Sequence, residues 1–264
     1  MTDRKALREV VLVYLAVTAA TVLITRLRAV PAAADYVHLL VGALFLVTAI
    51  KLAERERGGL RRFGIDLAGV LAPADADEPD ASAGPTAGTE DAPRPRRRSV
   101  VVDLVTALRD AAPSALRETL VALAVVAVVF PPFALAFHFW HGPQHPFVLR
   151  VPPDLASFAL AQIVVVALPE EALFRGYVQT RLSDAFPKTI LLLGVRVSPL
   201  ALGVQAALFG LMHFVVDLSP ERLAVAFPAL LFGLVRSWRG GIGAALLVHA
   251  LSNVYADVLV RGWL

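Results

Sequence analysis

The chain has 264 residues, of which 57% are hydrophobic and only 18% are charged. Globular domains in water carry about 45–50% apolar and about 25% charged residues, so this apolar excess predicts an integral membrane protein. The absence of cysteine excludes disulfide scaffolds, thiol catalysis, iron–sulfur clusters and zinc sites with cysteine ligands. The formal net charge of only +3, with basic residues scattered between apolar runs, argues against a nucleic-acid partner.

Seven apolar segments are predicted to cross the membrane as helices, because a span needs about 20 mostly apolar residues. In chain order the predicted spans are 10–24, 36–50, 116–140, 155–168, a part of 190–216, 223–235 and 242–260. Pro131 and Pro132 are expected to kink the third span. The start of the fifth span depends on whether Arg196 and Pro199 precede it. The predicted fold class is an all-α polytopic transmembrane helix bundle of about seven spans.

Residues 72–99 have a different composition, rich in Ala, Pro, Asp and Gly and without an apolar period. Such a segment cannot bury enough apolar surface to offset its ordering entropy, so it is predicted to be a disordered linker. The alternative for its arginine run is a site that binds lipid or a partner. This linker divides the chain into an N-terminal two-span hairpin, residues 1–71, and a domain of residues 100–264.

Basic residues in the connections predict the orientation in the cell membrane. They are concentrated before the first span and after the second, fourth and sixth spans. Because connections rich in Lys and Arg remain on the cytoplasmic side, the N-terminus is expected in the cytoplasm and the C-terminus outside.

An acidic pair follows the fourth predicted span, and ionisable groups inside a bilayer are candidate functional residues because they are costly there. Glu171 and Arg175 are four positions apart, so on a helix they share a face and can form an ion pair. Glu170 is rotated from Glu171 by about 100°, which leaves its carboxylate free to act as a general base. The alternative is an acidic first turn of a helix that begins at Pro169.

Two further polar groups lie on apolar segments in the second half of the chain. His213 shares a helix face with Phe209, and such a histidine is either a catalyst or a packed, hydrogen-bonded residue. His249 and Asn253 are four positions apart, so an imidazole and a carboxamide project from one helix face. This pair can bind an oxyanion or a metal-bound water, or it can join two helices by hydrogen bonds.

The depth of these groups in the membrane depends on where two spans begin and end. If the fourth span ends at Leu168, Glu170 lies near the cytoplasmic face and His213 lies far from it. A fifth span that starts near Pro199, or a re-entrant stretch at 190–197, brings the two to a similar depth.

Taken in order, the three groups resemble the signature of the CPBP family of intramembrane proteases. This family includes the type II CAAX prenyl endopeptidases and bacteriocin-processing proteins. The resemblance covers residues 155–259 and not the N-terminal half. The family patterns EExxxR, FxxxH and HxxxN match, respectively, Glu170, Glu171 and Arg175; Phe209 and His213; and His249 and Asn253.

The resemblance implies an intramembrane endopeptidase whose partners are the lipid bilayer and a membrane protein or peptide substrate. Substrates of the family are prenylated proteins, peptides or membrane-anchored tails. The roles that it implies are water activation by Glu170 with help from His213, oxyanion stabilisation by His249 and Asn253, and support of the site or contact with the substrate by Glu171 and Arg175.

This glutamic-type mechanism needs no metal or other cofactor. The alternative is a zinc metalloprotease with Glu170, His213 and His249 as ligands. We prefer the metal-free hypothesis because Asn253 is a poor zinc ligand, whereas its amide suits an oxyanion hole. Two other classes remain as alternatives: a non-catalytic membrane scaffold or regulator, and a transporter with a proton relay built from Glu170, Glu171 and His213.

Overall fold

The computed structural model describes residues 3–67 and 100–264, with side chains described from residue 105 onward in the second stretch. The predicted linker, 72–99, lies outside the described residues. The helices are α1 (Arg4–Thr25), α2 (Pro31–Ala34), α3 (Val37–Glu54), α4 (Gly59–Phe63), α5 (Val100–His141), α6 (Leu155–Ala161), α7 (Leu168–Glu171), α8 (Gln179–Ala185), α9 (Pro199–Asp217), α10 (Ala226–Arg239) and α11 (Gly243–Trp263). Two π-helical segments, η3 (Gln162–Ala167) and η4 (Ala172–Val178), separate α6, α7 and α8.

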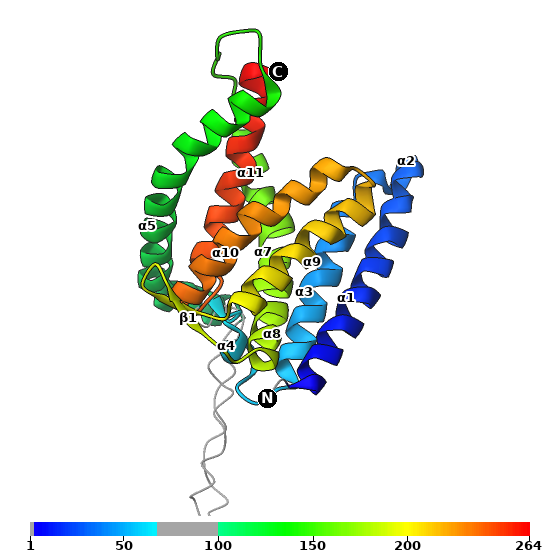
Figure 1. Cartoon of the computed structure of the whole chain (residues 1–264), viewed down its shortest axis with the longest axis vertical. Coiled ribbons are helices and arrows are strands. Elements are labelled where there is room, and N and C mark those ends of the chain that lie inside the picture. The colour runs from blue at the N-terminus through cyan, green and yellow to red at the C-terminus, as the bar shows by residue number, and fades with distance from the viewer. Residues whose placement is uncertain (1–2, 68–99) are drawn as a thin grey trace, which may run out of the picture.

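Six helices among the described residues are long and apolar enough to cross a membrane. Many of their large apolar side chains are exposed, including Leu15, Val128 and Phe139, as expected for helices whose outer faces contact lipid. The prediction of an all-α polytopic bundle is therefore confirmed, and the protein is a multi-pass membrane protein. The two chain ends lie at opposite ends of the bundle (Figure 1). Which end faces the cytoplasm stays a prediction.

The sixth predicted span, 223–235, differs from the expectation. It consists of a 3-10 segment, Pro220–Val225, followed by α10, which has 14 residues. A helix of that length is about 21 Å long, short of the roughly 30 Å of a bilayer's hydrocarbon core. Helix α10 packs on α9 and α11 and buries Ala229, Phe232, Gly233 and Val235, so it is a short helix of the bundle and not a full-length span.

The fourth predicted span was expected to end at Leu168, and this is wrong. The helical segment runs from Leu155 to Ala185 with Pro169 inside it. Proline has no N–H to donate to the carbonyl four residues earlier, here Val165, and the π-helical segments on either side of α7 accommodate the interruption. Helix α3 passes close by, since a Cβ atom on Gly42 would lie 2.7 Å from the Val165 oxygen. The two glutamates therefore lie near the middle of the helical segment and not at its end.

The fifth span begins at Pro199, one of the two starts considered from the sequence. The preceding residues form an antiparallel hairpin of β1 (Ile190–Leu192) and β2 (Val195–Val197), in which Leu191 pairs with Arg196. Leu193 and Gly194 both have positive φ, as a two-residue hairpin turn requires. Ser198 then caps α9 by accepting from the Ala201 amide.

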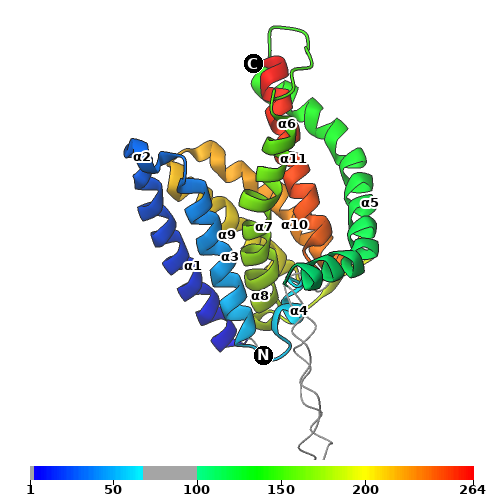
Figure 2. The ribbon, with the colours of Figure 1, turned by 180° about the vertical axis from the view of Figure 1, so that it is seen from behind.

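The N-terminal helices pack directly on the second half of the chain. Helix α1 contacts α8 and α9, and α3 contacts α7 and η4; Figure 2 shows α3 beside α7. One hydrophobic core includes Val10, Phe45, Phe174 and Phe209. The division into residues 1–71 and 100–264 stays a prediction about domains, but the two parts share one core in space.

Helix α5 lies at the other side of the bundle and packs mainly along α11 (Figure 1). It contains Pro113, Pro131 and Pro132 and is visibly bent (Figure 2), as prolines inside a helix cause. Arg239, at the end of α10, is bound to Glu118 of α5 through both carboxylate oxygens, at 2.6 and 3.1 Å. This ion pair joins the middle of α5 to the end of α10.

Candidate active site

A fully buried ion pair forms the centre of the candidate site. Glu171 ends α7 and Arg175 lies one turn later in η4, and both side chains are 0% exposed. The Arg175 Nη1 atom lies 2.9 Å from Glu171 Oε1, but its angle is not that of a hydrogen bond. The spacing of four residues thus brings the two charges together on one helix face, as the sequence predicts.

Aromatic rings surround the Arg175 guanidinium. Its central carbon lies 4.4 Å from the centroid of the Phe209 ring and 5.1 Å from that of Phe232. A cation over an aromatic face is attracted to the ring quadrupole, and more strongly where water is absent. The rings therefore provide part of the stabilisation that the Arg175 nitrogens do not obtain from hydrogen bonds.

His249, from α11, contacts the same carboxylate. Its Nδ1 lies 2.8 Å from Glu171 Oε1, and because a carboxylate accepts, Nδ1–H must donate. The imidazole stacks on Phe232, with centroids 4.7 Å apart and planes at 18°. Glu171 and Phe232 together fix both the ring plane of His249 and the direction of its second nitrogen.

Glu170 lies beside this centre and is the more accessible of the two glutamates. Its side chain is 16% exposed, against 0% for Glu171. Its Oε2 lies 3.7 Å from His249 Nε2, beyond hydrogen-bond distance. Glu170 thus retains a carboxylate that can contact water or a substrate.

His213, from α9, is half-buried and stands apart from the ion pairs. Its Nδ1 donates to the carbonyl oxygen of Phe209, 2.9 Å away, which leaves Nε2 as an acceptor in the neutral ring. Among the described residues, no hydrogen bond or ion pair joins His213 to Glu170. The Phe209 ring connects the two histidines, at 4.5 Å from His213 and 6.1 Å from His249.

Asn253 lies one turn after His249 on α11 and contacts a different helix. Its Nδ2 donates to Gln162 Oε1 at 2.9 Å, and both side chains are half-buried. This bond joins α11 to the first residue of η3. The structure thus brings Glu170, Glu171, Arg175 and His249 into one cluster, with Asn253 on its α11 side.

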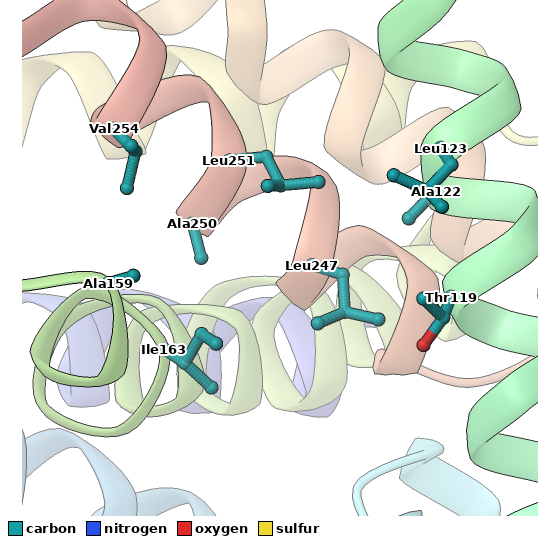
Figure 3. Close-up of a pocket in the computed structure, with 9 residues that line it drawn as sticks. All are labelled: Thr119, Ala122, Leu123, Ala159, Ile163, Leu247, Ala250, Leu251 and Val254. Carbon is teal, nitrogen blue, oxygen red and sulfur yellow. The ribbon is translucent and has the colours of Figure 1, made fainter. Parts of the chain in front are cut away.

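An apolar cavity of about 160 Å³ lies between α5, the α6–η3 stretch and α11 (Figure 3). Its lining residues are Thr119, Ala122, Leu123, Ala159, Ile163, Leu247, Ala250, Leu251 and Val254. Ile163 follows Gln162 in the chain, and Val254 follows Asn253. The cavity therefore lies against the same two elements as the amide pair, η3 and α11.

The sequence reasoning missed Gln162 and Phe232. Gln162 has a recognisable signal, since it is the single polar residue between Phe158 and Ala167. Phe232 has none, because one phenylalanine on an apolar helix is indistinguishable from a packing residue before the neighbouring helices are placed.

The positions of the possible metal ligands test the zinc alternative. In the described part of the chain, no three His, Asp or Glu side chains are grouped so that they can hold a metal ion. Glu171 engages the Nδ1 of His249, and a backbone carbonyl engages the Nδ1 of His213. These contacts leave the Nε2 atoms of both histidines as possible ligands, but Glu170, His213 and His249 are not grouped closely enough to form a three-ligand zinc site in this arrangement. The choice between metal and glutamate chemistry stays a prediction.

Comparison with known proteins found a similarity in the second half of the chain. Residues 152–255 match the family model described as "Type II CAAX prenyl endopeptidase Rce1-like". The matched range contains every motif residue, from Glu170 to Asn253. Neither the curated proteins nor the solved structures gave a match to the chain.

Proposed function

We propose that this protein, whose residues 152–255 match the Rce1-like family model, hydrolyses a peptide bond in a membrane-associated or C-terminally anchored substrate by glutamate chemistry. The observation that carries the proposal is the difference in accessibility between two adjacent carboxylates, those of Glu170 and Glu171. Arg175 and His249 enclose Glu171, whereas Glu170 remains accessible 3.7 Å from the His249 Nε2. One glutamate orients the site and the other does chemistry.

Glu170 acts as the general base in this mechanism. It takes a proton from water while the water oxygen attacks the scissile carbonyl carbon, and the carbonyl oxygen becomes negative. The protonated Glu170 then gives that proton to the amide nitrogen as the carbon–nitrogen bond breaks. His213 assists by accepting a hydrogen bond from the water at Nε2, since its Nδ1–H is held by Phe209.

His249 and Asn253 stabilise the negative oxygen. Because its Nδ1–H is held by Glu171, the His249 ring can donate from Nε2 only as a doubly protonated imidazolium. The Nε2–H of that imidazolium is then a donor for the oxyanion, and Asn253 supplies its second Nδ2–H. Glu171 and Arg175 hold the imidazole in place and need not touch the substrate.

The apolar cavity supports a substrate with an apolar group near the cleaved bond. Apolar cavities of about 150 Å³ stay dry and hold a benzene-sized ligand, so about 160 Å³ suits one aliphatic side chain or a short piece of a lipid chain.

The test compares wild-type protein with Glu170→Gln in proteoliposomes that contain a prenylated C-terminal peptide reporter and its unprenylated twin. Glu170→Gln keeps the shape but removes the base, so cleavage should fall by at least about 100-fold. Glu54→Gln, the same change on an exposed residue of α3, is the matched control and should cleave normally. Mass spectrometry of new C-termini identifies the bond.

Three results would contradict parts of this proposal. Equal cleavage by Glu170→Gln and wild-type protein removes Glu170 as the base. No cleavage of either reporter by folded wild-type protein removes the endopeptidase assignment. Loss of cleavage with a chelator, restored by added Zn²⁺, replaces glutamate chemistry with metal chemistry.

A further inference from the structure

Two carboxamides from distant parts of the chain meet at the edge of the candidate site. Gln162 begins η3 and Asn253 lies in α11, and Asn253 Nδ2 donates to Gln162 Oε1 at 2.9 Å. Both residues are half-buried, and η3 packs directly on α11. The bond is therefore made inside the bundle, between two elements that also border the apolar cavity.

A carboxamide needs such a partner if it is to act as a donor. The last torsion of an asparagine side chain is soft and roughly two-fold, and its oxygen and nitrogen ends have nearly the same shape. Asn253 can thus present either an acceptor or a donor to the same place. An acceptor oxygen next to Asn253 favours the orientation in which Nδ2 points to that acceptor.

We propose that Gln162 is a positioning residue that holds the amide of Asn253 as a donor to the oxyanion; this inference rests on the proposed function. Gln162 Oε1 takes one Nδ2–H, and the second Nδ2–H remains available to the substrate oxygen. Gln162 acts through Asn253 and does not itself touch the reacting atoms.

The local helix geometry gives Gln162 this direction. π-Helical segments are rare, but those that occur are often at functional sites. The π-helical segment η3 starts at Gln162. A π-helical bulge contains one residue more than a regular turn, and one residue corresponds to about 100° of rotation. In a regular α-helix Gln162 would thus face a different direction relative to Glu170. The π segment lets one helix carry both the base and the partner of the oxyanion donor.

The experiment measures kcat and KM with the prenylated reporter in proteoliposomes. Gln162→Leu removes the acceptor, so kcat should fall about 10- to 100-fold with KM unchanged, somewhat less than the loss of a whole oxyanion donor. Gln162→Glu keeps an acceptor and should cleave at least about tenfold faster than Gln162→Leu. If Gln162→Leu does not fold, Gln162→Met replaces it, since this side chain is also apolar but unbranched.

A double-mutant cycle separates positioning from general support of the fold. In an Asn253→Ala background, Gln162→Leu should have no further effect, because the group through which it acts is gone. Gln205 is the control: it is a buried glutamine that donates to the Leu202 and Ala229 carbonyls on α9 and α10. Gln205→Leu should lower activity by the same factor in both backgrounds.

The opposing results are distinct from a failure of the proposed function. Cleavage by wild-type protein together with unchanged kcat in Gln162→Leu overturns only this inference. An equal loss of kcat in Gln162→Leu and Gln162→Glu also overturns it. The same holds if Gln162→Leu lowers kcat by the same factor in the Asn253→Ala background as in the wild-type background. Absence of cleavage by folded wild-type protein overturns the proposed function and this inference with it.

Discussion

Two arginines six residues apart on the same membrane-spanning stretch have very different surroundings. Arg175 is 0% exposed, and one carboxylate and two aromatic rings surround it. Arg181 is 5% exposed, and it contacts Glu9 of α1, Asp184 of α8 and Glu56 of the α3–α4 connection. Both are buried cations, but only the second has more than one carboxylate for a partner.

The difference separates a structural network from a candidate catalytic one. The Arg181 group ties three parts of the chain together, and Arg62 extends it by binding both Glu56 and Asp184. In the Arg175 group, all three guanidinium nitrogens and the second oxygen of Glu171 have no hydrogen-bond partner. A buried polar group without a partner is costly, and such a cost persists at functional sites where the strained arrangement is part of the mechanism.

The largest effect is expected from the substitution Arg175→Met, which tests whether the Arg175 group is a buried ion pair. Removing one partner of a buried ion pair leaves an uncompensated charge, here on Glu171, and costs about 3–5 kcal/mol. We expect that loss in the free energy of unfolding, measured by SDS titration in mixed micelles, together with loss of cleavage.

The matched variant removes both charges, as Arg175→Met with Glu171→Leu. Replacing a whole buried pair by apolar groups is often neutral or stabilising, so most of the stability should return, while cleavage should not because His249 has lost its acceptor. A single Arg175→Met as stable as wild-type protein would mean that the centre is not a true ion pair.

Arg181→Met should have a smaller effect. The carboxylates around Arg181 are 28–30% exposed, so water screens them once the cation is gone. We expect a loss of about 1–2 kcal/mol, between the values for exposed and buried pairs, with cleavage per folded molecule unchanged. A loss of activity at unchanged stability would place Arg181 in the functional site and cancel the comparison.

Local spacing explains how much of the site the sequence predicts. Residues four apart on a helix share a face, so the pairing of Glu171 with Arg175 and the common face of His249 and Asn253 follow from the sequence alone. That periodicity does not specify which residue on another helix each side chain meets. The contact of His249 with Glu171, not Glu170, depends on how α11 packs on α7.

The parts of the fold that the sequence did not predict also depend on contacts between residues far apart in the chain. Pro169 is a signal for a helix end, yet the helix continues through it. π-Helical segments flank the proline, and Gly42 lets α3 pack closely against the carbonyl of Val165. Hydropathy predicts six helices well because a span must be apolar along its length. It says less about α10, a helix of 14 residues whose place depends on the helices packed around it.

The smallest predicted effect is the salt dependence of the stability that each arginine substitution costs. The Debye length falls from about 10 Å at about 0.1 M to about 3 Å at about 1 M salt, and ions screen accessible pairs far more than buried ones. The cost of Arg181→Met should therefore shrink by less than about 1 kcal/mol between these conditions. The cost of Arg175→Met should stay the same, because neither member of that pair is exposed. The measurement is the SDS titration of both variants and wild-type protein at each salt concentration. Equal salt dependence for the two variants would mean that ions reach both groups, and the Arg175 centre would then be an open, hydrated site instead of a closed one.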